Sequence, residues 1–158
     1  MNNKKICVVG LGYIGLPTSA MFATHGCQVI GVDVNKEVVN ALNRGEIIIE
    51  EPYLDIMVQA AVRSGHLKAD IKPQEADVFI IAVPTPITED KKADMSCVTS
   101  AAEMIVPYLK KGNLVILEST SPTGTVESLL VPILEKSGLK VGEELYVGHS
   151  PERVLPGK

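Results

Sequence analysis

Three glycines near the N-terminus, Gly10, Gly12 and Gly15, form the pattern G-x-G-x-x-G directly after a short apolar run. Between a strand and a helix, such a turn binds the pyrophosphate of a dinucleotide. The first glycine permits the tight turn, the second lets phosphates approach the backbone, and the third lets the helix pack closely on the strand. Tyr13 and Ile14 are expected to turn their backbone N–H groups toward the phosphates. The alternative is an ordinary tight turn.

A carboxylate follows at a second position that suits a dinucleotide. Asp33 ends the next apolar run, eighteen residues after Gly15, near the spacing of the acid that holds the adenosine ribose. A carboxylate there accepts from the ribose 2′-OH and repels a 2′-phosphate, so NAD is predicted rather than NADP. Lys36 is interpreted as a solvated side chain. The alternative for Asp33 is a purely structural role in capping the following helix.

Polar residues also follow two later apolar runs. The sequence "VPTP" (83–86) carries Thr85, and "ESTSPTGTVE" (118–127) carries Ser119 and Thr120. A helix N-terminus surrounded by hydroxyl groups suits an anionic or polar ligand. We therefore expect these three side chains to face the cofactor, with a simple helix cap as the alternative for the second segment.

The last apolar run leads into "SPER" (150–153), which presents Glu152 and Arg153. A carboxylate beside a nicotinamide can act as a general base, and a fixed guanidinium can hold a sugar or a phosphate. The alternative is a surface ion pair. His149, immediately before this segment, is expected to be structural or solvated and is not counted among the site residues.

The elements that must position these residues alternate along the chain. Apolar runs without polar alternation predict buried parallel strands, and amphipathic stretches between them predict helices on both faces. The predicted fold is therefore α/β, a Rossmann-type doubly wound parallel sheet. The predicted strands are 5–10, 28–34, 67–70, 76–86, 113–120 and 143–150, and the predicted helices are 16–26, 35–45, 51–67, 94–112 and 124–138.

Composition excludes several classes of protein. The 158 residues suit one domain, and a hydrophobic fraction of 46% is enough for a core. A net charge of −4 argues against a nucleic-acid partner, and no run has the ~18 apolar residues that a membrane span needs. Cys7, Cys27 and Cys97 match no zinc pattern and are interpreted as reduced cysteines in core elements of a cytoplasmic protein, so no metal site is predicted.

Together these segments resemble the UDP-glucose/GDP-mannose dehydrogenase family. The resemblance covers the whole chain and rests on six stretches in order: "VVGLGYIGLP", "GVDVN", "NRGEIIIEEPYL", "IAVPTP", "ILESTSPTGT" and "SPERVLPG". The last two are most similar to the branch that oxidises UDP-N-acetylmannosamine. The UDP-glucose branch usually has phenylalanine where Arg153 stands and an acid where Pro156 stands, so a glutamate contact to the cofactor at that position does not carry over.

The resemblance implies a twofold NAD-dependent oxidation of a sugar C6 alcohol to a carboxylate, through a thiohemiacetal and a thioester on a cysteine. It implies that Thr120 places a water near C6, that Glu152 is an acid/base or water-positioning group, and that Arg153 and Val154 touch the UDP-sugar. The family's catalytic cysteine and lysine lie downstream of this motif. We therefore expect residues 1–158 to be the NAD-binding domain, without the central helix and C-terminal domains.

Such a domain alone is expected to be inactive, and a full-length enzyme is expected to be a homodimer through regions outside this chain. Three alternatives remain open at this point. They are a UDP-glucose or other UDP-hexosamine dehydrogenase, a dehydrogenase of the 3-hydroxyacid type, and a non-catalytic NAD-sensing module. The loops "ESTSPTGT" and "SPERVLPG" argue against the 3-hydroxyacid type, and polar residues at several strand ends favour an enzyme over a sensor.

Overall fold

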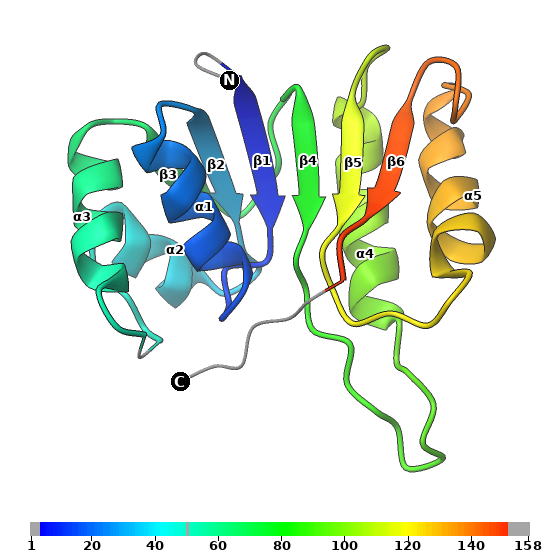
Figure 1. Cartoon of the computed structure of the whole chain (residues 1–158), viewed down its shortest axis with the longest axis horizontal. Coiled ribbons are helices and arrows are strands. Elements are labelled where there is room, and N and C mark those ends of the chain that lie inside the picture. Colours follow the sequence, from blue (N-terminus) through cyan, green and yellow to red (C-terminus); the bar gives the residue numbers. More distant parts are fainter. Residues whose placement is uncertain (1–3, 50, 152–158) are drawn as a thin grey trace.

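The computed structural model describes residues 4–49 and 51–151, which form a six-stranded, all-parallel sheet with helices on both faces (Figure 1). The strand order is β3-β2-β1-β4-β5-β6. The chain thus begins at the central strand β1 and builds one half of the sheet outward to β3, and then builds the other half outward from β4 to β6. This is the doubly wound order of dinucleotide-binding domains. The strands are β1 (Lys5–Val9), β2 (Gln28–Val32), β3 (Leu67–Asp70), β4 (Val78–Ile81), β5 (Leu114–Leu117) and β6 (Tyr146–His149).

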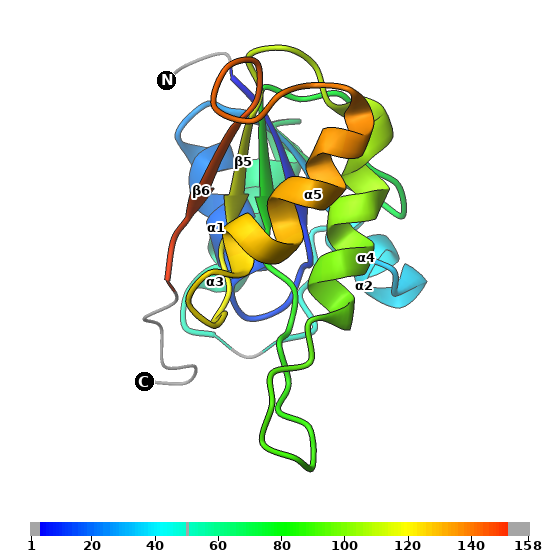
Figure 2. The ribbon, with the colours of Figure 1, turned by 90° about the vertical axis from the view of Figure 1, so that its right-hand side faces the viewer.

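The helices divide between the two faces of the sheet (Figure 2). α1 (Gly15–Thr24) and α3 (Leu54–Arg63) pack on one face around a core that includes Val8, Val58 and Ile80. α4 (Ser96–Ile105) and α5 (Val131–Leu134) pack on the other face. α2 (Lys36–Asn43) contacts the edge strand β3. The predicted fold class and the predicted order of elements are thus confirmed.

Two predicted helices are shorter or more broken than expected, and proline is the physical reason in both. The helix predicted for 94–112 ends as α4 at Ile105 and continues only as a short 3₁₀ turn, because Pro107 has no N–H to donate. The helix predicted for 124–138 is divided into a π turn (Val126–Leu130), α5 and a 3₁₀ turn. Pro132 cannot donate to the carbonyl four residues earlier, which interrupts the regular ladder.

Side-chain caps and glycines mark several of the helix ends. The Asn35 side chain accepts from the N–H of Glu37 at the start of α2, and Asp94 accepts from the N–H of Ser96 at the start of α4. Gly26 and Gly45 have positive φ angles just after α1 and α2. Such angles cost a glycine little, which explains why the helices stop there.

A narrow β-hairpin, which we call the arm (residues 86–94), projects beyond the carboxyl ends of the strands (Figures 1 and 2). The sequence did not predict it. Ile87 and Ala93 form an antiparallel bridge, Thr88 N–H donates to Lys92 O (2.8 Å), and Asp94 N–H donates to Pro86 O (2.7 Å). The arm is therefore held by its own backbone, while Ile87 remains 76% exposed.

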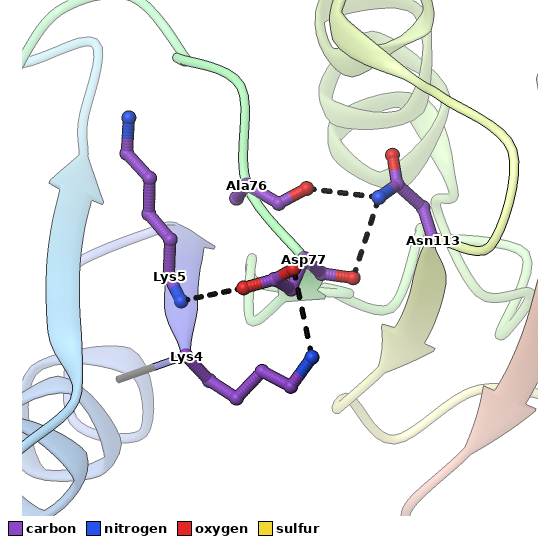
Figure 3. Close-up of polar contacts among 5 residues, drawn as sticks. All are labelled: Lys4, Lys5, Ala76, Asp77 and Asn113. Atoms are coloured by element: carbon purple, nitrogen blue, oxygen red, sulfur yellow. Dashed lines mark hydrogen bonds and ion pairs between the residues drawn. The ribbon is translucent and has the colours of Figure 1, made fainter. Parts of the chain in front are cut away.

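At the opposite edge of the sheet, a polar network joins the beginnings of three strands (Figure 3). The Asp77 carboxylate accepts from the backbone N–H of Lys5 (2.8 Å) and lies 3.7 Å from Lys4 Nζ. Asn113 is only 7% exposed; its amide donates to Ala76 O (2.9 Å), and its side-chain oxygen accepts from Lys110 N–H (2.7 Å). These bonds align β1, β4 and β5 at their amino ends.

Two of the three cysteines lie in the core as expected. Cys7 and Cys27 are buried, and burial raises the pKa of the Cys7 thiol to about 11, so that it stays protonated at neutral pH. Within residues 4–49 and 51–151, no helix combines the length and apolar character needed to cross a bilayer.

We expect Asn113→Ala to lower the free energy of unfolding by about 1–3 kcal/mol, because it removes the partner of two part-buried backbone groups, the Ala76 carbonyl and the Lys110 N–H. Asn43→Ala is the matched control. Asn43 also bridges a backbone N–H and a carbonyl, both of Ala69, but it is exposed, so water can replace its bonds. Urea denaturation measures the free energy of unfolding of both variants. Equal losses in the two variants would contradict the expectation that the burial of Asn113 makes its hydrogen bonds more important for stability.

Candidate cofactor-binding site

A cavity of about 780 Å³ opens at the carboxyl ends of the strands, where β1 and β4 lead in opposite directions. Ligands of doubly wound sheets bind in this crevice. Its walls come from the loops after β1, β2, β4 and β5 and from α4. Of the predicted site residues, the cavity is lined by Gly10, Gly12, Tyr13, Ile14, Asp33, Thr85, Ser119 and Thr120.

The glycine turn has three different spatial requirements. Gly10 has φ +97°, and a Cβ there would clash with the carbonyl of Ala82, just after the neighbouring strand β4. A Cβ on Gly15 would collide with the carbonyl oxygen of Gly10, so Gly15 permits the close packing of α1 on the turn and does not line the cavity. A Cβ on Gly12 would meet nothing within 4 Å. The space above Gly12 therefore suits a ligand that approaches Tyr13 and Ile14, which line the cavity just before α1.

Asp33 is half-buried and connects the second strand to the glycine turn. One carboxylate oxygen accepts from Leu11 N–H (2.9 Å), and the other accepts from Asn35 N–H (2.9 Å). The structure is consistent with both roles considered for Asp33 from the sequence, because the residue supports the start of α2 and also lines the cavity. A carboxylate has about four acceptor sites, so these two bonds leave capacity for ribose hydroxyls.

The loop after β5 is held by hydrogen bonds from both of its neighbours. Thr85 Oγ1 donates to the carbonyl of Thr120 (2.7 Å), and His149 Nε2 contacts the carbonyl of Ser119 (3.0 Å). The hydroxyls of Ser119 and Ser121 are 2.8 Å apart. Thr85 thus lines the cavity as predicted, but its proton goes to the protein backbone and not to a ligand. The contact of His149 agrees with the structural role that was one of its two expected roles, although the sequence did not indicate its partner.

α4 contributes a wall that the sequence did not predict. Cys97, Ser100, Ala101 and Met104 line the cavity, so Cys97 is half-buried at the site and not confined to the core as expected. Their spacing is that of one helical face, which from sequence alone is typical of core packing. Glu118 also lines the cavity and accepts from Thr18 Oγ1 (3.4 Å). The position of Glu118 at the end of an apolar strand could have identified it as a site residue from the sequence.

Glu152, Arg153 and Val154 lie outside the described residues, so their predicted roles stay predictions. The described residues end at Pro151. They nonetheless have the parts that a dinucleotide needs: open space above a glycine turn, a helix N-terminus for the phosphates, and a carboxylate after the second strand.

Comparison with known proteins agrees with this geometry. Residues 4–158 match the sequence profile described as the UDP-glucose/GDP-mannose dehydrogenase family, NAD binding domain. The chain belongs to this family. NAD is therefore the cofactor of this family domain, as its glycine turn and Asp33 predicted.

Individual members of the family are similar over nearly the whole chain. The UDP-N-acetyl-D-mannosamine dehydrogenase of Methanococcus maripaludis is 50% identical, over 98% of this chain and 35% of that protein. The NDP-N-acetyl-D-galactosaminuronic acid dehydrogenase of Ralstonia solanacearum is also 50% identical, over 98% and 38%. The solved structure of the UDP-N-acetyl-mannosamine dehydrogenase from Staphylococcus aureus has a TM-score of 0.93 at 50% identity, over 97% and 38%. The chain thus spans well under half the length of these relatives.

We expect the domain to bind NAD more tightly than NADP, and Asp33→Asn to weaken NAD binding by about 1.5–3 kcal/mol, typical of hydrogen bonds to a charged group. The variant should also discriminate less against NADP. Calorimetric titration with both dinucleotides measures this. Asp70→Asn, at the end of the neighbouring strand β3 and outside this cavity, is the matched control. Equal affinity of the unmodified domain for NAD and NADP would refute the role of Asp33.

Valine at Gly12 should affect NAD binding, whereas valine at Gly15 should affect stability. Gly12→Val has room in the protein but fills the space of the pyrophosphate, so binding should be lost while the melting temperature changes little. Gly15→Val meets the Gly10 backbone and should cost about 3 kcal/mol of stability through overpacking. Thermal unfolding and NAD titration of the pair separate the two roles. NAD binding by Gly12→Val at near the original affinity would show that the turn is structural only.

Proposed function

We propose that this chain is the cofactor domain of an NAD-dependent nucleotide-sugar 6-dehydrogenase, which oxidises the C6 alcohol of UDP-N-acetylmannosamine to the uronic acid. The observation that carries the proposal is the combination of two features in one cavity. The glycine turn and Asp33 form a dinucleotide site, and a polar loop with Ser119 and Thr120 stands at the other side of the same opening. A cofactor-sensing module would need only the first feature.

The choice of sugar rests on the relatives. Proteins named UDP-N-acetyl-D-mannosamine dehydrogenase from Methanococcus maripaludis and Staphylococcus aureus are each 50% identical to this chain. The protein from Ralstonia solanacearum, named for N-acetyl-D-galactosaminuronic acid, is as similar. An N-acetylhexosamine substrate is common to both names, so a galactosamine derivative is the second candidate.

The proposed roles divide between the cofactor and the chain. Bound NAD supplies the acceptor for a hydride from C6. Thr120, exposed at the rim of the cavity, would position a water near C6. Glu152 would act as acid/base or orient that water, and Arg153 and Val154 would contact the UDP-sugar. These assignments rest on the resemblance of "ESTSPTGT" and "SPERVLPG" to the family motifs.

The wider setting follows from the same proposal. A full-length enzyme of this kind would be a cytoplasmic homodimer that supplies uronic acids for surface polysaccharide synthesis. Its substrate would be a UDP-sugar, with neither nucleic acid nor a membrane as a partner. Size-exclusion chromatography with light scattering on a full-length protein tests the dimer directly.

We expect the chain of 158 residues to produce no NADH from UDP-N-acetylmannosamine, even at saturating NAD. Twofold oxidation requires the aldehyde to be retained covalently, and a crevice formed by one domain provides neither the proximity nor the exclusion of water that the reaction needs. Absorbance at 340 nm measures NADH, with a full-length relative as the positive control. Steady turnover by this chain alone would refute the assignment as a cofactor domain.

In a full-length enzyme, Glu152→Gln should lower kcat by at least about a hundredfold, the typical contribution of an acid–base group. Thr120→Ala should also lower kcat, through the loss of the positioned water, while NAD affinity stays close to normal in both variants. Arg153→Ala should mainly raise the KM for the UDP-sugar. Steady-state kinetics with UDP-N-acetylmannosamine and its galactosamine counterpart test both the roles and the substrate. Loss of NAD affinity in parallel with kcat would contradict the proposed roles.

A further inference from the structure

The loop 119–121, which follows β5, is held from both sides by side chains of segments next to it in the sheet. Thr85 comes from the loop after β4, and His149 comes from the end of β6. We propose that Thr85 and His149 are positioning residues that fix this loop for the nicotinamide half of the cofactor. The inference rests on the proposed cofactor site and extends it to two residues that have no part in the glycine turn or in the catalytic motifs.

Thr85 acts through the backbone of Thr120. Its hydroxyl has one proton, and that proton is donated to the carbonyl of Thr120 at 2.7 Å. The hydroxyl can therefore accept a hydrogen bond from a ligand but cannot donate one. Because the same carbonyl belongs to the residue proposed to place the reacting water, the position of Thr85 sets the position of Thr120.

His149 holds the preceding carbonyl and thereby extends the pairing of β5 with β6. Main-chain pairing ends where Ser150 N–H donates to Leu117 O (2.9 Å). The next carbonyl on the same side of β5 is that of Ser119, and His149 Nε2 reaches it at 3.0 Å. Since a carbonyl only accepts, Nε2 must carry the proton, which fixes the tautomer of the ring.

The position of loop 119–121 in the sheet indicates which half of the cofactor it meets. Asp33 follows β2 and would take the adenosine ribose, and the glycine turn after β1 would take the pyrophosphate. The remaining half must extend over β4 and β5. Three strand spacings separate β2 from β5, roughly 14 Å, so loop 119–121 lies at the end of the cavity opposite to Asp33.

Fixing this loop before binding has an energetic consequence. A loop that must be ordered by its ligand reduces affinity by the entropy lost on ordering. Two hydrogen bonds to successive carbonyls, from opposite sides, leave little freedom to lose. Removing either bond should therefore weaken the ligand that uses the loop, without altering the adenosine half of the cavity.

The test compares NAD with ADP-ribose, which has every part of the cofactor except the nicotinamide ring. Calorimetry on this chain should show that Thr85→Val lowers NAD affinity by about threefold to tenfold, the range for one neutral hydrogen bond, with less than a twofold change for ADP-ribose. Thr85→Ser keeps the donor and should restore NAD affinity. His149→Leu should behave like Thr85→Val, and His149→Gln, which keeps an N–H donor, should restore part of the loss.

Matched controls use the same substitutions at similar bonds outside the cavity. Thr88 Oγ1 donates to the carbonyl of Lys92 within the arm, and the His25 ring contacts the carbonyl of Met21. Thr88→Val and His25→Leu should leave both affinities unchanged. Melting temperatures of all variants identify any that fail to fold, and if Thr85→Val is one of them, His149→Leu carries the comparison.

Equal losses for NAD and ADP-ribose in Thr85→Val and His149→Leu would overturn the inference, because they would indicate general distortion of the site. Unchanged NAD affinity in both variants would overturn it as well. If the unmodified chain bound neither ligand, the proposed cofactor site would be rejected, and the inference with it. Binding of both ligands with no selective effect would reject the inference alone.

Discussion

The close approach of Gly15 to the carbonyl of Gly10 is the constraint on which the carboxyl edge of this domain depends. It allows α1 to begin directly above the end of β1, and Gly10 in turn lies against the carbonyl of Ala82, just after β4. Three backbone segments thus meet without side chains between them. This contact brings the N-terminus of α1 to the point where the sheet reverses its winding, and the cavity forms around that point.

The polar groups at the two edges of the sheet have different functions. At the amino edge, Asp77 and Asn113 use their side chains to join neighbouring strands, and their hydrogen bonds are directed into the protein. At the carboxyl edge, the strands end in glycine, hydroxyl and carboxylate groups that face an open cavity. Alignment of β1, β4 and β5 at the amino edge therefore determines how precisely groups as distant in sequence as Gly10 and Thr120 are placed at the carboxyl edge.

Local signals predicted most of the fold, while the details that depend on tertiary contacts were not accessible from the sequence. Apolar runs, amphipathic stretches and the spacing from Gly15 to Asp33 indicated the strands, the helices and the cofactor. The donation from Thr85 to the Thr120 carbonyl joins residues 35 positions apart, and no pattern reveals it. Cys97 looked like a core residue because a helical face toward a cavity has the same spacing as one toward a core.

The arm has a consequence for how such a domain can vary. Its base is closed by the hydrogen bond from Asp94 N–H to Pro86 O, and the chain on either side of that bond leads to cavity residues, Thr85 and Ser96. The separation of these two cavity walls is thus fixed at the base, whatever the length or composition of the tip. Insertions and deletions in the tip are uncoupled from the geometry of the cavity, so this segment is free to diverge during evolution while the cofactor site stays unchanged.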